Sequence, residues 1–515
     1  MKKYAILLFF AFICFYAFAE SYKINEVSYD MKGLTRQYAL SQKVPLDTTQ
    51  LFSSTEKFET YIEDIRQLLN NQRVFQTSDI TLTYLEENED GVIPVNVLIS
   101  TVDTLNIICV PYPSYNSNSG ITLKLKLKDY NFFGSMETMT FDLNYQADSS
   151  DEMEDVSHIY GLTFGFEIPF NLIAIPTSWD SNFKFSYTYG NPEMDMSILE
   201  GLNFSIPIGE ITSLDFAFNQ NYFQNSNYID ISDDKYFQEA FSLSLPFTIA
   251  TIPNWFSIRW TPAINFTYNW DKDAFEGEDY GGMTEESLRG PLFKVSHSFS
   301  GKRINWLGNF RDGISASLNQ SYAYNFYDDT DNMNLTFSSQ YYKKLCSFIG
   351  FSSRQYWYKN YDDSAVEFGS MIRGIRDSDL TSSDFIVLNL DFPFSVFKTH
   401  WGKWLGWDKL NYVDFECQLS PFFDMVCGYN TYADSYYNFK DGWYGTGLEV
   451  IVFPERFRSI QCRASFGIDL VQFLEKQSED KPDLQETTDI LLNTNWRQGV
   501  SSGWYELSIG VGLFY

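Results

Sequence analysis

The feature that most constrains this chain is a long series of short segments in which apolar and polar residues alternate. In residues 121–128 the even positions hold Thr122 and three lysines, and the odd positions hold Ile121, Leu123, Leu125 and Leu127. A period of two is typical of a β-strand that presents one apolar face. Sixteen more such segments follow, at 138–145, 159–168, 183–190, 198–207, 211–222, 237–247, 256–269, 292–300, 313–327, 333–342, 347–358, 384–394, 411–427, 443–453, 460–470 and 504–515.

A transmembrane β-barrel accounts for this pattern and for the composition. The 515 residues include 47 Phe, 35 Tyr and 12 Trp, yet the mean hydropathy is −0.25. Aromatic residues favour strands and membrane interfaces, and a barrel strand is apolar only at alternate positions. After the first twenty residues, no apolar run reaches the roughly 18 residues of a membrane-spanning helix. Since single-chain barrels have even strand numbers, we predict a mainly β chain with sixteen antiparallel strands over 121–515.

The first nineteen residues predict an export signal. Lys2-Lys3 precede an apolar run over 5–18, which ends in the small-x-small triplet Ala17-Phe18-Ala19. These are the three regions of a secretory signal peptide, so we expect cleavage before Glu20. A lipoprotein cysteine at Cys14 is a weaker alternative, because the apolar run continues beyond it.

The charge argues against nucleic acid as a partner. The formal net charge is −30, whereas binding to phosphate needs concentrated lysine and arginine. The acidic residues cluster between predicted strands, where solvated loops are expected; cation bridging to anionic surface lipid is the alternative. The three histidines are scattered and no nucleophile motif lies near them, so we expect no enzyme activity, no metal site and no cofactor. They are His158, His297 and His400.

Residues 20–105 predict a small α+β domain ahead of the barrel. Segments 22–34, 80–84 and 92–102 are expected to form strands. Ser53 and Glu56 form a capping box for a helix whose apolar positions recur at helical spacing, namely Phe58, Ile62, Ile65 and Leu69. Residues 106–120 contain two prolines and a run of serine and asparagine, which predicts a linker.

A basic, glycine-bent segment, 371–377, lies between two trains of predicted strands. Gly374 lets the backbone turn, and Arg373 carries a charge that needs a carboxylate partner inside a barrel. Candidate partners lie on the next two strands. Strand parity places Asp391 with Asn389, and Asp424 with Phe422, on faces that point away from lipid.

These pieces, in this order, resemble the BamA/TamA superfamily of outer-membrane assembly and translocation barrels. Residues 20–105 resemble a single POTRA domain, and 121–145 resemble the family's first barrel hairpin. The segment around Arg373 is similar to the family's arginine-glycine-aromatic loop, although Ile375 stands where an aromatic is usual. Three further motifs resemble the strands that follow this loop, at 389–393, 422–424 and 445–448. The resemblance implies that Arg373 pairs with Asp424 in the lumen, with Asp391 as a second candidate, and that Gly374 and Phe422 belong to this loop lock.

The last segment predicts how the barrel closes. One face of it, the apolar one, consists of Tyr505, Leu507, Ile509, Val511, Leu513 and Tyr515. A chain that ends on an aromatic residue resembles the signal by which outer-membrane barrels are recognised. Gly510 and Gly512 give this strand little to pack with. We therefore predict a weak seam between this strand and residues 121–128.

The resemblance implies a protein of the outer membrane with a periplasmic N-terminal domain. It would insert β-barrel proteins into that membrane or translocate polypeptide across it, receiving clients by strand addition on the N-terminal domain and then at the seam. Its partners would be membrane lipid and unfolded outer-membrane or secreted polypeptides, with periplasmic chaperones and accessory lipoproteins as further candidates.

Two alternatives remain open from the residues. The first is a passive solute channel, with interior charges that set its selectivity, namely Lys124, Lys126, Lys128, Asp391 and Glu506. The second is that the N-terminal domain acts only as a spacer. The sequence does not name the client, nor does it separate general assembly from secretion of one dedicated partner.

Overall fold

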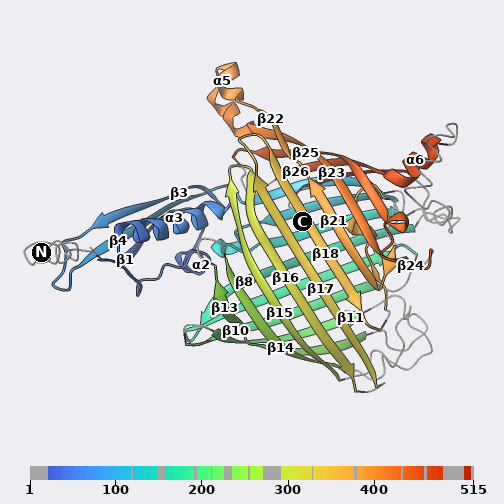
Figure 1. Ribbon diagram of the computed structural model, residues 1–515, viewed down its shortest axis with the longest axis horizontal. Coiled ribbons are helices and arrows are strands. Elements are labelled where there is room, and N and C mark those ends of the chain that lie inside the picture. The colour runs from blue at the N-terminus through green and yellow to red at the C-terminus, as the bar shows by residue number, and fades with distance from the viewer. Residues whose placement is uncertain are drawn as a thin grey trace, which may run out of the picture. The chain divides into compact units, whose positions relative to one another are not determined.

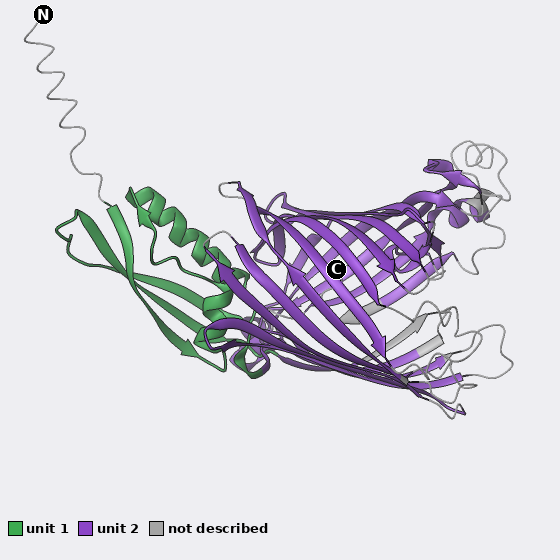
Figure 2. Ribbon diagram, turned by 90° about the horizontal axis from the view of Figure 1, so that it is seen from below, with its two compact units in different colours: residues 1–106, 133–136, 457–459 green, residues 107–132, 137–456, 460–515 purple. Residues whose placement is uncertain are grey.

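A computed structural model describes most of the chain after the predicted signal. The described residues are 21–116, 120–148, 157–190, 194–209, 212–224, 235–252, 256–270, 291–326, 329–362, 364–375, 380–430, 433–456, 461–478 and 504–511. The predicted export signal, 1–19, lies outside them. The chain forms two compact units (Figure 2): unit 1 contains residues 1–106, 133–136 and 457–459, and unit 2 contains the rest.

Unit 1 is a four-stranded sheet with two helices. Its strands β1 (Ser21–Lys32), β2 (Leu51–Phe52), β3 (Phe75–Tyr84) and β4 (Val92–Asp103) lie in the order β2-β1-β4-β3. Strand β1 is parallel to β4, whereas β3 is antiparallel to it. The helices are α2 (Gln37–Lys43) and α3 (Thr55–Asn71).

Helix α3 supplies the core of unit 1. All four apolar positions predicted from helical spacing are buried in it, namely Phe58, Ile62, Ile65 and Leu69. Its N-cap is Ser54, whose hydroxyl accepts a hydrogen bond from the Lys57 amide at 3.3 Å. The predicted capping box, with Ser53 as the N-cap, was therefore wrong by one residue: Ser53 instead accepts a hydrogen bond from the Lys57 ammonium.

Unit 2 is a closed barrel whose strands follow one another around the wall (Figure 1). Its first half contains β5 (Ile107–Asn116), β6 (Gly120–Asp129), β7 (Met139–Asp148), β8 (Ser157–Leu172), β9 (Ile175–Thr188), β10 (Met194–Ile208), β11 (Thr212–Gln224), β12 (Lys235–Ser244), β13 (Phe247–Thr251) and β14 (Ser257–Trp270). Its second half contains β15 (Leu292–Leu307), β16 (Phe310–Asn325), β17 (Thr330–Lys344), β18 (Gly350–Asn360), β21 (Asp384–Asp391), β22 (Phe394–Lys398), β23 (Phe415–Asn430), β24 (Ser435–Tyr436), β25 (Trp443–Pro454), β26 (Cys462–Asp469) and β27 (Tyr505–Val511). Strand β27 returns to lie beside β5.

Short elements occupy the connections of the barrel. They are η1 (Phe132–Gly134), β19 (Val366–Glu367), η4 (Gly369–Met371), β20 (Thr381–Ser382), α5 (Trp401–Leu405), η5 (Asp408–Val413), η6 (Phe439–Asp441) and α6 (Leu470–Ser478). In the part of the chain that the structure describes, no helix is both long enough and apolar enough to cross a membrane.

The prediction of a mainly β chain with a large barrel is confirmed, but the predicted strand number was wrong. Strands β12 and β13 share one position between β11 and β14, β21 and β22 share another, and the short β24 pairs only with the end of β23. Counted by position, the described residues form eighteen barrel strands instead of sixteen. All seventeen alternating segments contribute a strand.

The eighteenth strand is β5, which lies in the segment predicted to be a linker. It pairs with β6 along its whole length, from Ile107 opposite Asp129 to Asn116 opposite Gly120. Pro111 and Pro113 are the reason for the wrong prediction, because proline removes a donor from a sheet and is usually confined to edges and bulges.

The outer wall of the barrel is apolar at alternate positions. On β14 the side chains of Ile264, Phe266 and Tyr268 are exposed, and they are separated by polar residues. On β21 the contrast is sharp, because Ile386 is 37 % exposed while its neighbours Phe385 and Val387 are 0 % and 1 % exposed. Ordinary soluble proteins rarely expose so large an apolar surface.

Replacing Phe58 by Ala should destabilise unit 1. The ring is fully buried, stacks on Tyr22 with 5.6 Å between ring centres and packs edge-to-face against Phe52 at 5.3 Å. Its loss leaves a cavity that lowers the free energy of unfolding by about 3–5 kcal/mol. Urea denaturation of a fragment spanning 21–105 measures this. Leu68→Ala, on the exposed side of the same helix, should change it by only about 0.5 kcal/mol; equal losses for both variants would contradict the packing described.

Candidate functional site

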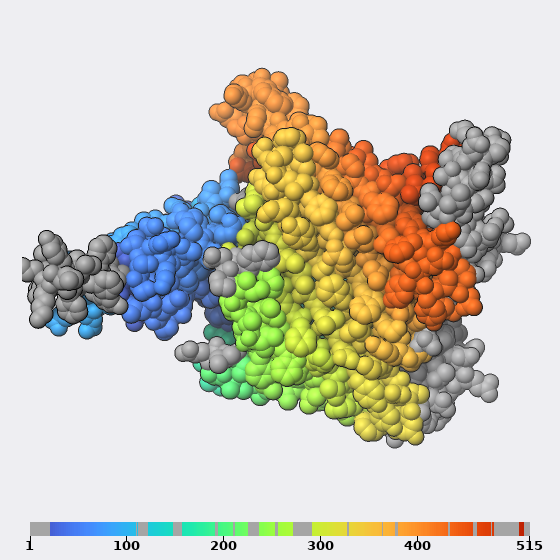
Figure 3. All heavy atoms as spheres, in the orientation of Figure 1, coloured from blue at the N-terminus to red at the C-terminus, as the bar shows by residue number. Residues whose placement is uncertain are grey.

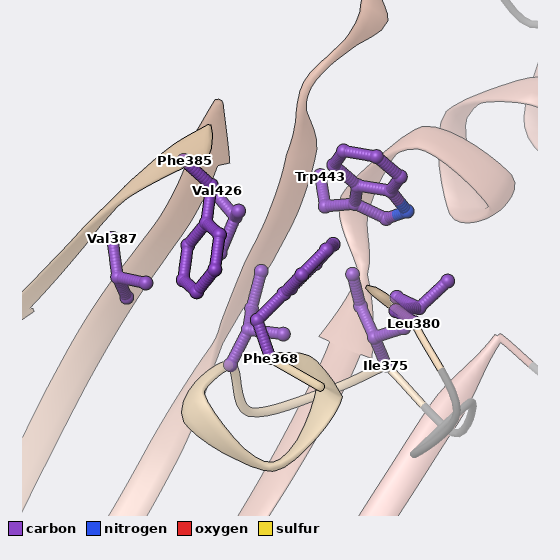
Figure 4. Packing of buried hydrophobic residues seen from close by; sticks show 8 residues of the cluster. Phe368, Ile375, Leu380, Phe385, Val387, Val426 and Trp443 are labelled. Atoms are coloured by element: carbon purple, nitrogen blue, oxygen red, sulfur yellow. The ribbon is translucent and has the colours of Figure 1, made fainter. Parts of the chain in front are cut away.

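The connection between β18 and β21 is residues 361–383, and its described residues, 361–362, 364–375 and 380–383, pack against the inner face of the barrel wall. Its apolar residues Phe368, Ile372, Ile375 and Leu380 form a buried cluster with side chains of β21, β23 and β25, namely Phe385, Val387, Val426 and Trp443 (Figure 4). We call this connection the inner loop. Since the exposed residue Ile386 lies between Phe385 and Val387, the cluster occupies the face of β21 opposite the apolar outer wall.

Arg373 is the centre of the polar half of the inner loop. Its Nε and Nη2 donate to the two carboxylate oxygens of Asp424 at 2.8 and 2.7 Å, and its Nη1 donates to Asp391 at 2.7 Å. The Arg373 amide also donates to Asp424, at 2.9 Å. The guanidinium carbon lies 3.9 Å from the centre of the Phe422 ring. The pair with Asp424 therefore has the two-pronged geometry of a strong charge-assisted interaction.

Burial makes these contacts matter for stability. Asp424 is fully buried and the Arg373 side chain is 13 % exposed. A buried ion pair contributes little beyond what it costs to remove two charges from water, but removal of one partner leaves a charge without compensation, at a cost of about 3–5 kcal/mol. Arg373 is thus necessary for the seating of the inner loop once Asp424 and Asp391 are buried.

Gly374 connects the inner loop with β27, the last strand of the barrel. Its amide donates to the Glu506 carboxylate on β27 at 2.8 Å. Its φ angle is +91°, and a Cβ there would lie 2.7 Å from the Ile468 carbonyl oxygen. A side chain at position 374 would therefore clash with β26 as well as strain the backbone.

Further polar residues extend the network along the inner wall. Asn389 donates to the Met371 carbonyl at 3.0 Å, which fixes the loop just before the arginine. Glu449 pairs with Arg463 at 3.0 Å and lies 4.0 Å from Arg373. The ionised side chains of β21, β23, β25 and β26 are thereby joined through one chain of contacts.

The structure brings the predicted loop residues together, since Arg373, Gly374, Asp391, Phe422 and Asp424 meet in this one site. The sequence analysis did not assign Glu449 or Arg463 to it. Glu506 had been assigned only to the interior face. The signal that could have found all three is a charged residue at an inward position of an alternating strand.

The predicted seam was wrong in one of its two strands. Strand β6, with Ile121, Leu123, Leu125 and Leu127, lies between β5 and β7 and does not meet β27. Strand β27 lies between β26 and β5, and its predicted residues that the structure describes are Tyr505, Leu507, Ile509, Gly510 and Val511. Gly512, Leu513 and Tyr515 lie outside the described residues.

The prolines of β5 face this seam. Successive residues of a strand direct their N–H groups to opposite edges, so the nitrogens of Pro111 and Pro113 lie on the same edge. Pairing of β5 with β6 runs through both prolines without interruption, which requires N–H donors on the edge toward β6. The proline nitrogens therefore face β27, and that side of β5 lacks two backbone donors.

Across the described ranges, no group of three or more His, Cys, Asp or Glu side chains could hold a metal ion.

Comparison with known proteins identifies similar solved structures only. No family model matches the chain, and no curated protein matches it. CdiB from Acinetobacter baumannii is 11 % identical, with 96 % of this chain and 74 % of that chain covered and a TM-score of 0.48. BamA from Haemophilus ducreyi lacking POTRA domains 1–3 is 10 % identical, with 95 % and 84 % covered and a TM-score of 0.38. CdiB from Escherichia coli is also 10 % identical, with 88 % of each chain covered and a TM-score of 0.39. Similarity at this level carries no argument about function.

Arg373→Ala should release the inner loop while the barrel stays folded. The variant leaves Asp424 buried without its partner, so the loop loses about 3–5 kcal/mol of seating free energy. Limited chymotrypsin digestion should then cut within 361–383, and the heat-dependent shift of the folded barrel on a denaturing gel should persist.

Lys343→Ala provides the control for this prediction. It removes an ion pair with Asp312 in which the lysine side chain is 49 % exposed, and such surface pairs contribute little to stability. The digestion pattern of this variant should match that of the unmodified protein. An Arg373→Ala variant that resists digestion equally well would show that the inner loop is held by its apolar cluster alone.

Proposed function

We propose that this chain is an outer-membrane protein that inserts β-barrel proteins into that membrane or translocates polypeptide across it. It would act without a cofactor, through main-chain hydrogen bonds with its clients. Three features support the proposal. The outer wall is apolar, the β5 edge that faces β27 lacks two backbone N–H donors, and the inner loop contacts β27.

The outer wall supports residence in a membrane. In lipid every backbone amide needs an internal partner, and a closed barrel provides this. The predicted export signal and the exposed apolar residues at alternate strand positions agree with an outer-membrane barrel. The periplasmic face would be the end at which the chain enters β5, because most connections are short there, as between Leu172 and Ile175 or between Leu307 and Phe310.

The seam is the single observation that carries the proposal. A client strand can enter a closed sheet only where two neighbouring strands separate, and each unpaired amide in hydrocarbon costs several kcal/mol. At the edge of β5 that faces β27, Pro111 and Pro113 have no N–H to lose. Separation there therefore costs less than between two strands that keep all their backbone donors, and the exposed edge of β27 keeps its donors and acceptors for a client strand.

The inner loop would control this seam from inside the barrel. Through Gly374 and Glu506 it holds β27, and through Arg373 it is anchored on β21 and β23. The inner loop is thus anchored on β21 and β23 and also bonded to β27. These two attachments would keep β27 in place while its edge exchanges β5 for a client strand. The same loop occupies the interior beside β21, β23 and β25, which disfavours a simple solute channel.

Unit 1 would receive clients before they reach the barrel. We infer that it is a POTRA-like periplasmic domain, on the basis of its strand order and its two helices. Strand β3 is at one end of the sheet, and within the described residues it pairs only with β4. Its free edge can accept an extended client segment, with backbone hydrogen bonds that tolerate many sequences.

Restoring the two backbone N–H donors that β5 lacks should slow the insertion of client proteins. Pro111→Val with Pro113→Val adds two N–H groups toward β27, each of which can form a bond that contributes about 0.5–1.5 kcal/mol. Client insertion should then slow by about fivefold or more if the seam must open. The measurement is the rate at which an unfolded barrel protein becomes folded in vesicles that contain the variant.

Pro262→Val is the matched control. Pro262 lies on β14, where it is paired with His297 of β15 and is far from the seam in strand order. This variant should insert clients at the rate of the unmodified protein. Equal insertion rates for the unmodified protein, the double variant and Pro262→Val would show that the β5–β27 seam does not need to open.

Depletion in the native cell separates the two forms of the function. Loss of many barrel proteins from the outer membrane would indicate general assembly, whereas loss of one surface or secreted protein would indicate a dedicated role. The channel alternative makes a different prediction, namely steady conductance in a planar bilayer without any client and no change in the membrane proteome beyond solute uptake.

A further inference from the structure

The connection between β22 and β23 differs from its neighbours at the same end of the barrel. Others at this end are short, such as the turn between Leu307 and Phe310, whereas this one extends from Thr399 to Asp414 and contains α5 and η5. Figure 1 shows α5 beyond the end of β22 and outside the barrel wall, and Figure 3 shows the same projection in orange at the top of the molecule. We call residues 399–414 the aromatic arm.

The aromatic arm is a folded structure with its own polar anchor. The buried Asp414 carboxylate accepts hydrogen bonds from the Trp401 amide at 2.7 Å and from the Thr399 hydroxyl at 3.3 Å. The Trp407 amide donates to the Gly402 carbonyl at 3.0 Å. The Arg456 guanidinium carbon lies 3.7 Å from the centre of the Tyr412 ring. The fold of the arm therefore fixes which of its side chains face outward.

The outward side chains of the arm are large and apolar. Trp404 is 55 % exposed, Leu405 65 % and Trp407 58 %, although burial of such residues is a main source of stability in ordinary folds. Tyr412 and Val413 are also more than half exposed. The folded arm therefore presents two tryptophans and a leucine as an apolar surface that the described residues of this chain do not cover.

We propose that the aromatic arm inserts into the periplasmic leaflet of the outer membrane and lies at its interface with water. The inference rests on the proposed membrane location of the barrel. It goes beyond it by assigning a lipid-binding function to a segment outside the barrel wall.

Continuity with the barrel wall identifies lipid as the occupant. Near the end of β22, Val396 and Phe397 are 52 % and 48 % exposed. The apolar surface of the wall therefore comes close to the arm, with the exposed residues Lys398 and His400 between them. Tryptophan and tyrosine are the residues that favour the headgroup level of a membrane. The arm lies at the end of the barrel with short connections, which is the periplasmic end.

The charges of the aromatic arm agree with anionic lipid. Its exposed charged residues are Lys403, Asp408 and Lys409, a small basic excess in a chain with a net charge of −30. Lysines next to an apolar surface are attracted to the negative headgroups of a membrane. A surface that binds another folded protein would not require lysines beside the tryptophans, whereas a surface at the headgroup level would favour them.

Fluorescence quenching by lipid tests the proposal on the full chain. One accessible cysteine per variant is placed at Leu405 on the arm, at Ile264 on the outer wall of β14 or at Leu68 on α3 of unit 1. Cys109, Cys346 and Cys462 are replaced by serine, and the buried Cys417 and Cys427 are kept. Each variant is labelled with an environment-sensitive dye and reconstituted in vesicles of phosphatidylethanolamine and phosphatidylglycerol. Quenchers attached near the headgroup or at the end of the acyl chain report the depth of each site.

The expected result is loss of emission at Leu405 with the shallow quencher, at Ile264 with the deep one, and at Leu68 with neither. Replacing Trp404 and Trp407 by Ser should then reduce the quenching at Leu405 and leave that at Ile264 unchanged. Quenching at Ile264 without quenching at Leu405 would overturn the interfacial arm and leave the outer-membrane proposal intact, with the arm as a surface for a protein partner. Absence of quenching at Ile264 would overturn both.

Discussion

A guanidinium inside the barrel is the constraint on which the inner loop depends. Arg373 cannot lose its charge, and at 13 % exposure it has little water around it. Asp424 satisfies two of its donors and Asp391 a third. Because the two carboxylates come from the paired strands β21 and β23, the arginine fixes the path of the loop over these strands. The position of Gly374, and hence its contact with Glu506 on β27, follows from that arrangement.

Strand β27 is therefore held in two unlike ways. On its inner face, a charged acceptor binds the amide of a glycine whose conformation allows no other residue. Along its edge toward β5, the partner strand lacks two donors at Pro111 and Pro113. In the proposed function these two features belong together, because a strand that exchanges edge partners needs a second anchor that stays in place during the exchange.

The sequence could place the carboxylates of the loop site on an inward face because strand parity is a strict rule. Once β21 and β23 are recognised, a period of two determines that Asp391 and Asp424 face inward. It could not show that Glu506 reaches Gly374, since that contact joins residues far apart in the chain. Strand β5 was missed for a related reason: proline propensity is a local property, whereas its tolerance depends on which neighbour each nitrogen faces.

The aromatic arm and the seam both contain residues that local propensity disfavours. A residue that contradicts the local rule, whether proline in a strand or exposed tryptophan on a folded arm, is stable only if its surroundings remove the penalty. For Pro111 and Pro113, the seam removes it, because the donors they lack are not needed to hold β5 on β6. In the described part of the chain, Trp404 and Trp407 are left 55 % and 58 % exposed. In the proposal made above, the environment that covers them is a leaflet of lipid next to Val396 and Phe397.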